Sequence, residues 1–226
     1  MPVEHHPSVS QKTVAEQNLS FRDELRTQRF DDHRYYHQSR INQTLHLISA
    51  TSFMAAYVLL FTNLTAAVMM GWLVAMVTRQ SGHFFFEPRE YDRINRASHE
   101  HKEDIKVGYN LQRKRILHGV WAIIPFVLYL QPSMFGLMQP AKGWEGYFHN
   151  LAILWFVLAV SALLLRTVYL IFSAGTQCGL VWITKILTDP FNDFKTYLKS
   201  PLYLLKGELM DPMPYVDAPQ SAARND

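Results

Sequence analysis

The chain has 226 residues, of which 49% are hydrophobic, with a mean hydropathy of -0.06 and a formal net charge of +3. A charge this modest, with basic residues gathered near the ends of apolar runs, excludes nucleic-acid binding and favours a membrane protein with substantial polar parts. The single cysteine, Cys178, excludes an internal disulfide and a cysteine-rich zinc site.

The two ends of the chain differ from its centre. Residues 1–17 and 211–226 are polar and contain prolines, so we expect both to be disordered. We expect no cleavable signal sequence, because the first apolar run begins too far into the chain. Residues 18–210 are therefore expected to form one integral membrane domain.

The first apolar run lies between Arg40 and Arg79 and contains no charged residue. Because a helix needs about 20 residues to cross the hydrocarbon core, a run of this length predicts two short spans. We place them at residues 45–61 and 64–81, joined by a tight turn near Thr62, Asn63 and Leu64.

Two further spans are expected downstream, at residues 116–137 and 150–172. The third contains Pro125 and Pro132 and should be kinked or end near Gln131. The fourth is interrupted by Arg166 alone, and no turn signal flanks that residue. The sequence therefore predicts an all-α protein with four transmembrane helices.

Residues 179–205 mix aromatic residues with lysines, a pattern typical of amphipathic helices that lie on a membrane surface. We expect one or two such helices, split at Pro190 and Pro201. They would either cover the histidines described below or bind a partner protein.

The distribution of basic residues orients these spans. Six Lys and Arg precede His46, nine lie from Arg79 to Arg115, and the short connection at Lys142 has one. Under the positive-inside rule, the N-terminus, the second connection and the C-terminus are expected to be cytoplasmic.

Seven of the ten histidines fall in or beside the segments assigned to that cytoplasmic face: His33, His37, His46, His83, His99, His101 and His118. Imidazole is the commonest protein metal ligand. A cluster at a bilayer boundary therefore predicts a metal held beside a lipid.

The first group of candidate residues is written YYHQSRINQTLH and includes Tyr36, His37, Asn42 and His46. Asn42 and His46 are four residues apart and share a helical face, whereas His37 and His46 would point in nearly opposite directions on one helix. If both histidines bind one metal, the chain must bend between them near Ser39. Alternatively, both are ordinary residues at a membrane interface.

The second group follows the second span, where Gly82 and His83 precede three phenylalanines and Glu87. On a continued helix the side chains of His83 and Glu87 face the same way and can reach one ion or each other. The phenylalanines either form an apolar wall for an acyl chain or anchor the helix at the interface.

Together these groups give YH, four residues, N, three residues, H, and one helical hairpin later GH, three residues, E. This pattern, over about residues 34–88, resembles the small integral-membrane 2-hydroxy-fatty-acid dioxygenases of fungal sphingoid-base degradation and their bacterial relatives. The resemblance implies an iron(II) enzyme of alpha-oxidation, which uses dioxygen to shorten a 2-hydroxy fatty acid by one carbon. It places Tyr36, Asn42 and Glu87 at catalytic motif positions and implies a bacterial inner membrane rather than the endoplasmic reticulum.

The connection after Pro88 is longer and more charged than expected of that family, and it carries further candidates. His99 and His101 lie beside acidic residues and are either additional metal ligands or part of a solvated loop. Arg113 and Arg115 precede the third span, where they either neutralise a substrate carboxylate or only follow the positive-inside rule.

Iron(II) with three or four histidine or carboxylate ligands leaves positions open for dioxygen and a 2-hydroxycarboxylate. A boundary site would let the acyl tail stay in lipid while the polar head reaches the metal. Two alternatives stay open: a histidine-rich di-iron hydroxylase or desaturase, suggested by the spacing of His33 and His37, and a non-enzymatic subunit of a membrane complex. Iron content per chain distinguishes them.

Overall fold

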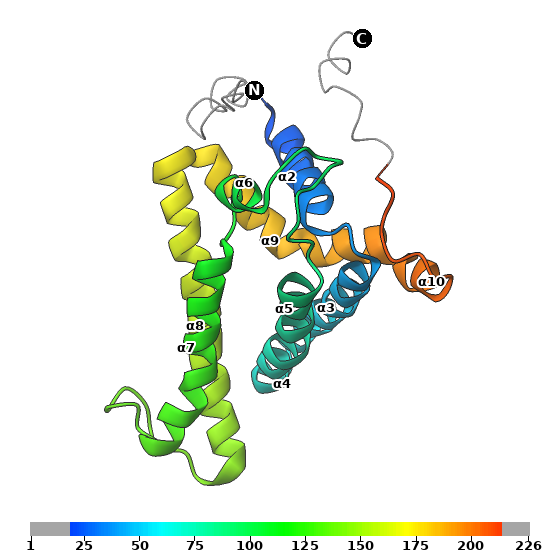
Figure 1. The fold of residues 1–226 in the computed structure, drawn as a ribbon. Coiled ribbons are helices and arrows are strands. Elements are labelled where there is room, and N and C mark those ends of the chain that lie inside the picture. The colour runs from blue at the N-terminus through cyan, green and yellow to red at the C-terminus, as the bar shows by residue number, and fades with distance from the viewer. Residues whose placement is uncertain (1–18, 214–226) are drawn as a thin grey trace.

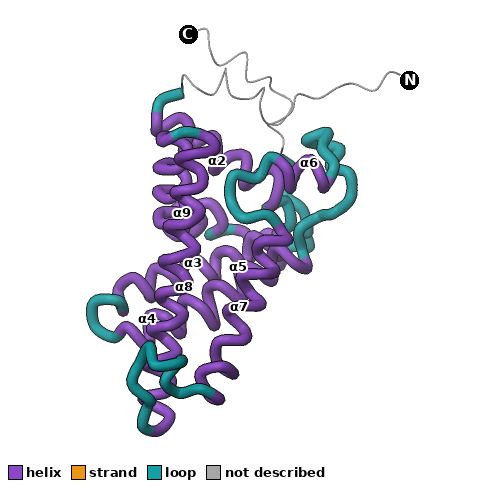
Figure 2. The backbone as a smooth tube through the Cα atoms, turned by 90° about the vertical axis from the view of Figure 1, so that its left-hand side faces the viewer, coloured by secondary structure: helices purple, strands orange, loops and turns teal. Residues whose placement is uncertain are grey.

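The computed structural model describes residues 19–213, which are helical with no strand (Figures 1 and 2). The helices in chain order are α2 (Phe21–Tyr36), α3 (Arg40–Leu59), α4 (Leu64–Met69), the π-helical η1 (Met70–Met76), α5 (Val77–Phe85), α6 (His99–Asp104), α7 (Leu111–Leu130), α8 (Gly143–Ala174), α9 (Thr176–Tyr197) and α10 (Ser200–Leu205). The prediction of an all-α protein is confirmed for this part of the chain.

Two helical hairpins extend in the same direction, one made by α3 with α4, η1 and α5, and the other by α7 with α8 (Figure 1). The expected turn is confirmed: α3 ends at Leu59, and the Asn63 side chain accepts a hydrogen bond from the Ala66 amide, which caps α4. Helix α9 crosses the upper ends of the hairpins, where it contacts α2, α3 and α8.

Tryptophans join the two hairpins. The indole N–H of Trp72 donates to the Trp155 carbonyl, and that of Trp155 donates to the Trp121 carbonyl, each at 3.1 Å. The rings of Trp72 and Trp121 stack with centroids 5.7 Å apart. Val68, Leu128, Leu151 and Ala152 complete this apolar core.

Several helix ends differ from those predicted from the sequence. Helix α7 stops at Leu130, so the last residues of the predicted 116–137 span lie outside it, as the prolines of that segment allow. Pro190 does not split the C-terminal segment, because α9 continues through it and breaks only before Ser200.

One helix of the described residues, α8, is by itself long and apolar enough to cross a membrane. At 32 residues it is about 48 Å long, well beyond the hydrocarbon thickness.

The ordered region extends past residue 210. Asp211 donates its amide to the Gln38 carbonyl at 2.8 Å and pairs with Arg40 at 3.0 Å, and Met213 is buried. Residues 211–213 therefore belong to the folded domain rather than to a disordered tail. Disorder was also predicted for residues 1–17 and 214–226, which lie outside the described part of the chain.

Candidate metal centre

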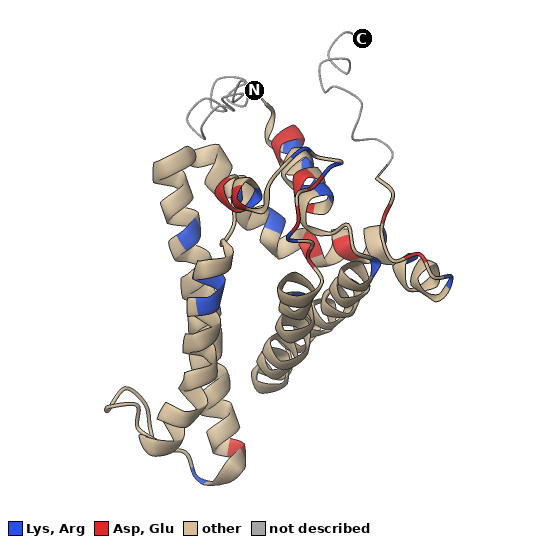
Figure 3. Ribbon diagram, viewed as in Figure 1, with Lys and Arg blue, Asp and Glu red and all other residues tan. Residues whose placement is uncertain are grey.

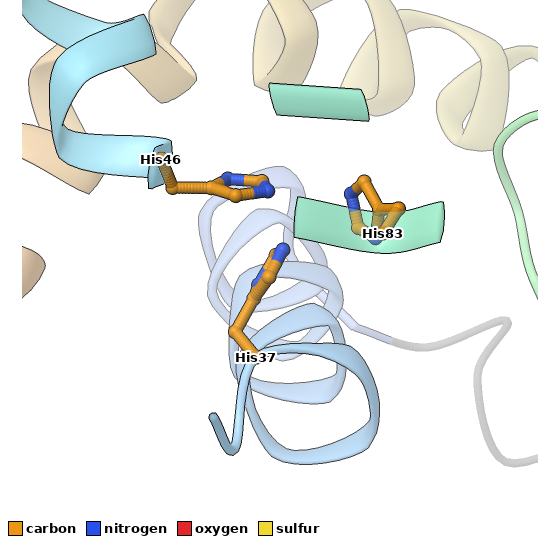
Figure 4. A group of neighbouring side chains, drawn as sticks. All are labelled: His37, His46 and His83. Carbon is orange, nitrogen blue, oxygen red and sulfur yellow. The ribbon is translucent and has the colours of Figure 1, made fainter. Parts of the chain in front are cut away.

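Three buried histidines from separate elements point toward one another (Figure 4). His37 lies at the end of α2, His46 in the second turn of α3, and His83 near the end of α5. One ring nitrogen from each lies within 4.8 Å of those from the other two, and the ring centroids are 4.1 to 5.1 Å apart. The chain thus places three imidazoles around one point.

The chain bends between His37 and His46, as the sequence predicted. Helix α2 ends at Tyr36, His37 adopts a non-helical conformation, and Ser39 caps α3 by accepting from the Asn42 amide. The Asn42 side chain stabilises the bend by donating to the Tyr36 carbonyl at 2.8 Å. This bend turns His37 back toward His46.

The histidine nitrogens fit a metal because they lack other partners. Both ring nitrogens of His37 and both of His46 are buried without a hydrogen bond from the described residues. Buried polar atoms are almost always satisfied, so such a group indicates an ion or water. Nitrogens bound at about 2.1 Å from one ion lie at most about 4.2 Å apart, so small ring movements would complete the site.

Two of the three imidazoles face carboxylates. Nδ1 of His83 lies 2.8 Å from Glu87, and Nδ1 of His46 lies 3.5 Å from Asp193, a separation without hydrogen-bond geometry. If Nδ1–H of each ring points to its carboxylate, Nε2 is left for the metal. Carboxylates behind metal-binding histidines fix the tautomer and ring orientation in this way.

Burial keeps the His37 imidazole in the form that binds metals. It lowers the pKa of His37 well below its usual value of 6.5, and the adjacent His46 adds to that shift. This ring is therefore neutral near pH 7, so a metal would not compete with protons for it.

Helix α9 supplies residues that the sequence analysis missed. Lys185, Asp189, Asp193 and Tyr197 recur every four residues and line one buried face. Asp193 pairs with Arg79 at 2.9 Å, and Tyr197 lies within 6.2 Å of both His37 and His46, centroid to centroid. The four-residue spacing could have indicated from the sequence that these side chains share one face, although it does not reveal which helix this face contacts.

A network of charges fixes α9 above the histidines. Lys185 lies 2.6 Å from Asp189 and 3.0 Å from Asp32 of α2, and Arg29 lies 3.4 Å from Asp189. Burial alone would lower the pKa of Lys185, but Asp189 and Asp32 raise it above its usual range. Each buried charge thus has an opposite partner, as burial requires.

The motif residues Tyr36 and Asn42 support the site from outside. The Tyr36 hydroxyl donates to the Lys102 carbonyl at 2.5 Å, which ties α2 to the connection after α5. Asn42 is fully buried against Gly82, and its Oδ1 has no hydrogen-bond partner in the described region. Glu87, by contrast, contacts a proposed ligand directly.

Other candidates lie apart from the three histidines. His99 and His101 are on α6 and do not belong to the group, although His99 lines a small cavity behind His83. His33 contacts the Tyr197 hydroxyl at 3.1 Å instead. Arg113 and Arg115 are exposed, and Arg113 lies over the Tyr169 ring.

Between these two arginines, Lys114 points into the cavity that His83 and Glu87 also line. Lys106 shares the cavity and lies 3.1 Å from Glu103 and 3.9 Å from Glu87. Of the three consecutive basic residues 113–115, Lys114 is therefore the one that shares a cavity with His83.

A larger cleft of about 460 Å³ lies between α2 and α9. Its floor includes Asp193 and Tyr197, the residues that contact the histidines from above. The cleft therefore extends to side chains that lie next to the histidines.

Comparison of the chain with models of protein families, with curated proteins and with solved structures found no match. The interpretation of the site therefore depends on its geometry and chemistry.

Proposed function

We propose that the protein is an iron(II)-dependent membrane dioxygenase that shortens a 2-hydroxy fatty acid, or a related lipid, by one carbon. The observation that carries the proposal is the convergence of His37, His46 and His83, buried and with nitrogens free for an ion. Three imidazoles and no thiolate suit iron(II), and three ligands leave positions for two further reactants. The motif resemblance over residues 34–88 supports the same chemistry.

The proposal includes four membrane spans, formed by α3, by α4 with η1 and α5, by α7 and by α8. All four carry large apolar side chains that are exposed, among them Val58, Leu73, Val74, Ile123, Phe126, Val157, Leu164 and Leu165. Exposed apolar side chains in this number suit helices that meet lipid. Figure 3 shows the charged residues gathered around the upper ends of the hairpins, with few at the turn below.

The histidines then lie at the polar boundary of the bilayer. His46 is close to the start of α3 and His83 close to the end of α5, the two ends that meet the charged region. We place this face in the cytoplasm because the basic residues gather there. An acyl chain could remain in lipid while its carboxyl end reaches the histidines.

The reaction balances without an external reductant. One 2-hydroxy acid and one dioxygen give the acid shortened by one carbon, one carbon dioxide and one water. Bound iron(II) would supply coordination positions for both reactants and the redox chemistry. The chain's own residues hold the metal, orient two imidazoles through Glu87 and Asp193, and limit access of water through burial.

The geometry supports one metal ion rather than two. Within residues 19–213 there is one group of three potential ligands, and His33, which a di-iron site would require, contacts Tyr197 and faces Asp211 at 3.8 Å. We therefore test the proposal that each chain binds a single metal ion.

The test is elemental analysis of detergent-purified protein together with oxygen consumption on 2-hydroxypalmitate. We expect one iron per chain and production of the acid shortened by one carbon. Replacing His37, His46 or His83 with Ala should abolish both, whereas His149→Ala should change neither, since His149 contacts Thr65 at the far end of the hairpins. Two irons per chain, or no bound metal, would contradict the proposal.

A further inference from the structure

We propose that Lys114 binds the carboxylate of a ligand that occupies the metal centre. This inference rests on the proposed metal centre and adds to it the residue that selects an acid over a neutral lipid. The evidence is the position of Lys114, the charge balance around it and the size of the cavity it lines.

Lys114 shares a cavity with a proposed metal ligand. The cavity is lined by His83, Glu87 and Lys114 together with Arg89, His99, Glu103, Lys106 and Leu111. His83 therefore belongs both to the lining of this cavity and to the group of three histidines. A ligand with one atom at the metal and another in this cavity would meet Lys114 beside His83.

The carboxylates in the cavity are already engaged. Glu103 accepts from Lys106 at 3.1 Å and, with its other oxygen, from the Leu111 amide at 2.6 Å. Glu87 faces His83 with one oxygen and lies 3.9 Å from Lys106 with the other. Both acidic groups thus have partners other than Lys114.

Of the three cations that line the cavity, Lys106 is paired with carboxylates, whereas Lys114 and Arg89 form no ion pair within 4.0 Å. The Lys114 side chain is half-buried, yet it makes no hydrogen bond to the described residues. Arg89, by contrast, donates to the Phe84 carbonyl at 2.9 Å. Three cations face two carboxylates here, and a bound divalent ion would increase the positive excess, so an anionic ligand is favoured.

The size of the cavity narrows the class of anion. Its volume of about 10 Å³ is close to the least that holds one water. A single oxygen of a small anionic group fits this space. A carboxylic acid whose second donor atom reaches the metal matches both this space and the excess of cations around it.

The experiment uses full-length protein in detergent, loaded with cobalt(II) as a coloured substitute for iron. The visible spectrum of cobalt reports ligand binding during titration with 2-hydroxyoctanoate and with 1,2-octanediol, a neutral analogue that lacks the carboxylate. We expect Lys114→Met to keep its cobalt and its affinity for the diol but to bind the acid roughly 10- to 100-fold more weakly. Lys114→Arg should recover part of this loss, and Arg115→Met should resemble the wild type.

The outcomes separate this inference from the proposed function. Wild-type protein that takes up no cobalt overturns the metal centre and this inference with it. Protein that takes up cobalt but binds the acid no better than the diol overturns the inference alone, and this comparison needs no variant. Equal acid affinity in Lys114→Met and the wild type also overturns it; if that variant does not fold, Lys114→Gln takes its place.

Discussion

Gly82 and Asn42 lie in contact across the α3–α5 interface so closely that a Cβ added at Gly82 would stand 2.0 Å from Oδ1 of Asn42. The same added atom would lie 3.5 Å from Cδ2 of His46. The glycine before His83 is therefore needed for space rather than for backbone flexibility, because it lets the two histidine-bearing helices approach each other.

We predict that Gly82→Ala disrupts the metal centre. The methyl group would displace the Asn42 amide and with it the hydrogen bond to Tyr36 that stabilises the α2–α3 bend. Overpacking of this kind costs about 1–3 kcal/mol. Metal content and the thermal midpoint should both fall. Gly119→Ala in α7 is the control, because an added Cβ there meets nothing within 4 Å; if both variants bind metal equally, the close contact is not important.

Glu87→Gln should weaken metal binding without unfolding the protein. The carboxylate faces Nδ1 of His83 at 2.8 Å, and loss of such a partner commonly reduces metal affinity 10- to 100-fold. Competition with a chelator of known affinity measures the change. Glu90→Gln, three residues away and exposed, serves as the matched control. Unchanged affinity in Glu87→Gln would argue against His83 as a ligand.

Stability should decrease in acid because of Asp193. Burial alone would raise the pKa of Asp193, but Arg79 and His46 lower it well below its usual value of 3.8. A carboxyl group with a lowered folded-state pKa stabilises the fold fully above the unfolded value, and this contribution is lost as the pH falls below about 4.

Thermal midpoints of the wild type and Asp193→Asn, measured between pH 3 and pH 6 in detergent, test this expectation. The wild type should be the more stable of the two above pH 4, and the difference should narrow as the pH falls further. A difference that stays constant across this range would show that the charge of Asp193 is not responsible.

A charge on the proposed lipid-facing surface should impair membrane insertion. Phe126 of α7 is 69% exposed and Val157 of α8 is 54% exposed. Arginine in the middle of a span costs about 2.5–3.5 kcal/mol in insertion, whereas an exposed position in water tolerates it. We expect Phe126→Arg and Val157→Arg to reduce the membrane-integrated fraction, with Phe126→Leu as the control. If the Phe126→Arg variant integrates fully into the membrane, α7 is not one of the membrane spans.

The sequence by itself determined the helices and the candidate ligands to a large extent. Charge-free runs placed the hairpin turn near Asn63. If His37 and His46 bind one metal, their nearly opposite directions on a single helix predicted a bend near Ser39, and the structure has a bend there. The four-residue spacing of His83 and Glu87 correctly placed these two side chains together. These features follow from local periodicity, which a single segment carries within itself.

Only the tertiary structure decided which segments surround the histidines. Asp193 and Tyr197 lie more than 140 residues after His46 in the sequence, and Lys114, not Arg113 or Arg115, lines the cavity that includes His83. Spacing along one helix specifies which residues share a face, but not which other helix that face meets. That pairing is set by long-range packing, here by the contacts of Trp72 with Trp155 and Trp121 between the hairpins and by the ion pairs between α2 and α9.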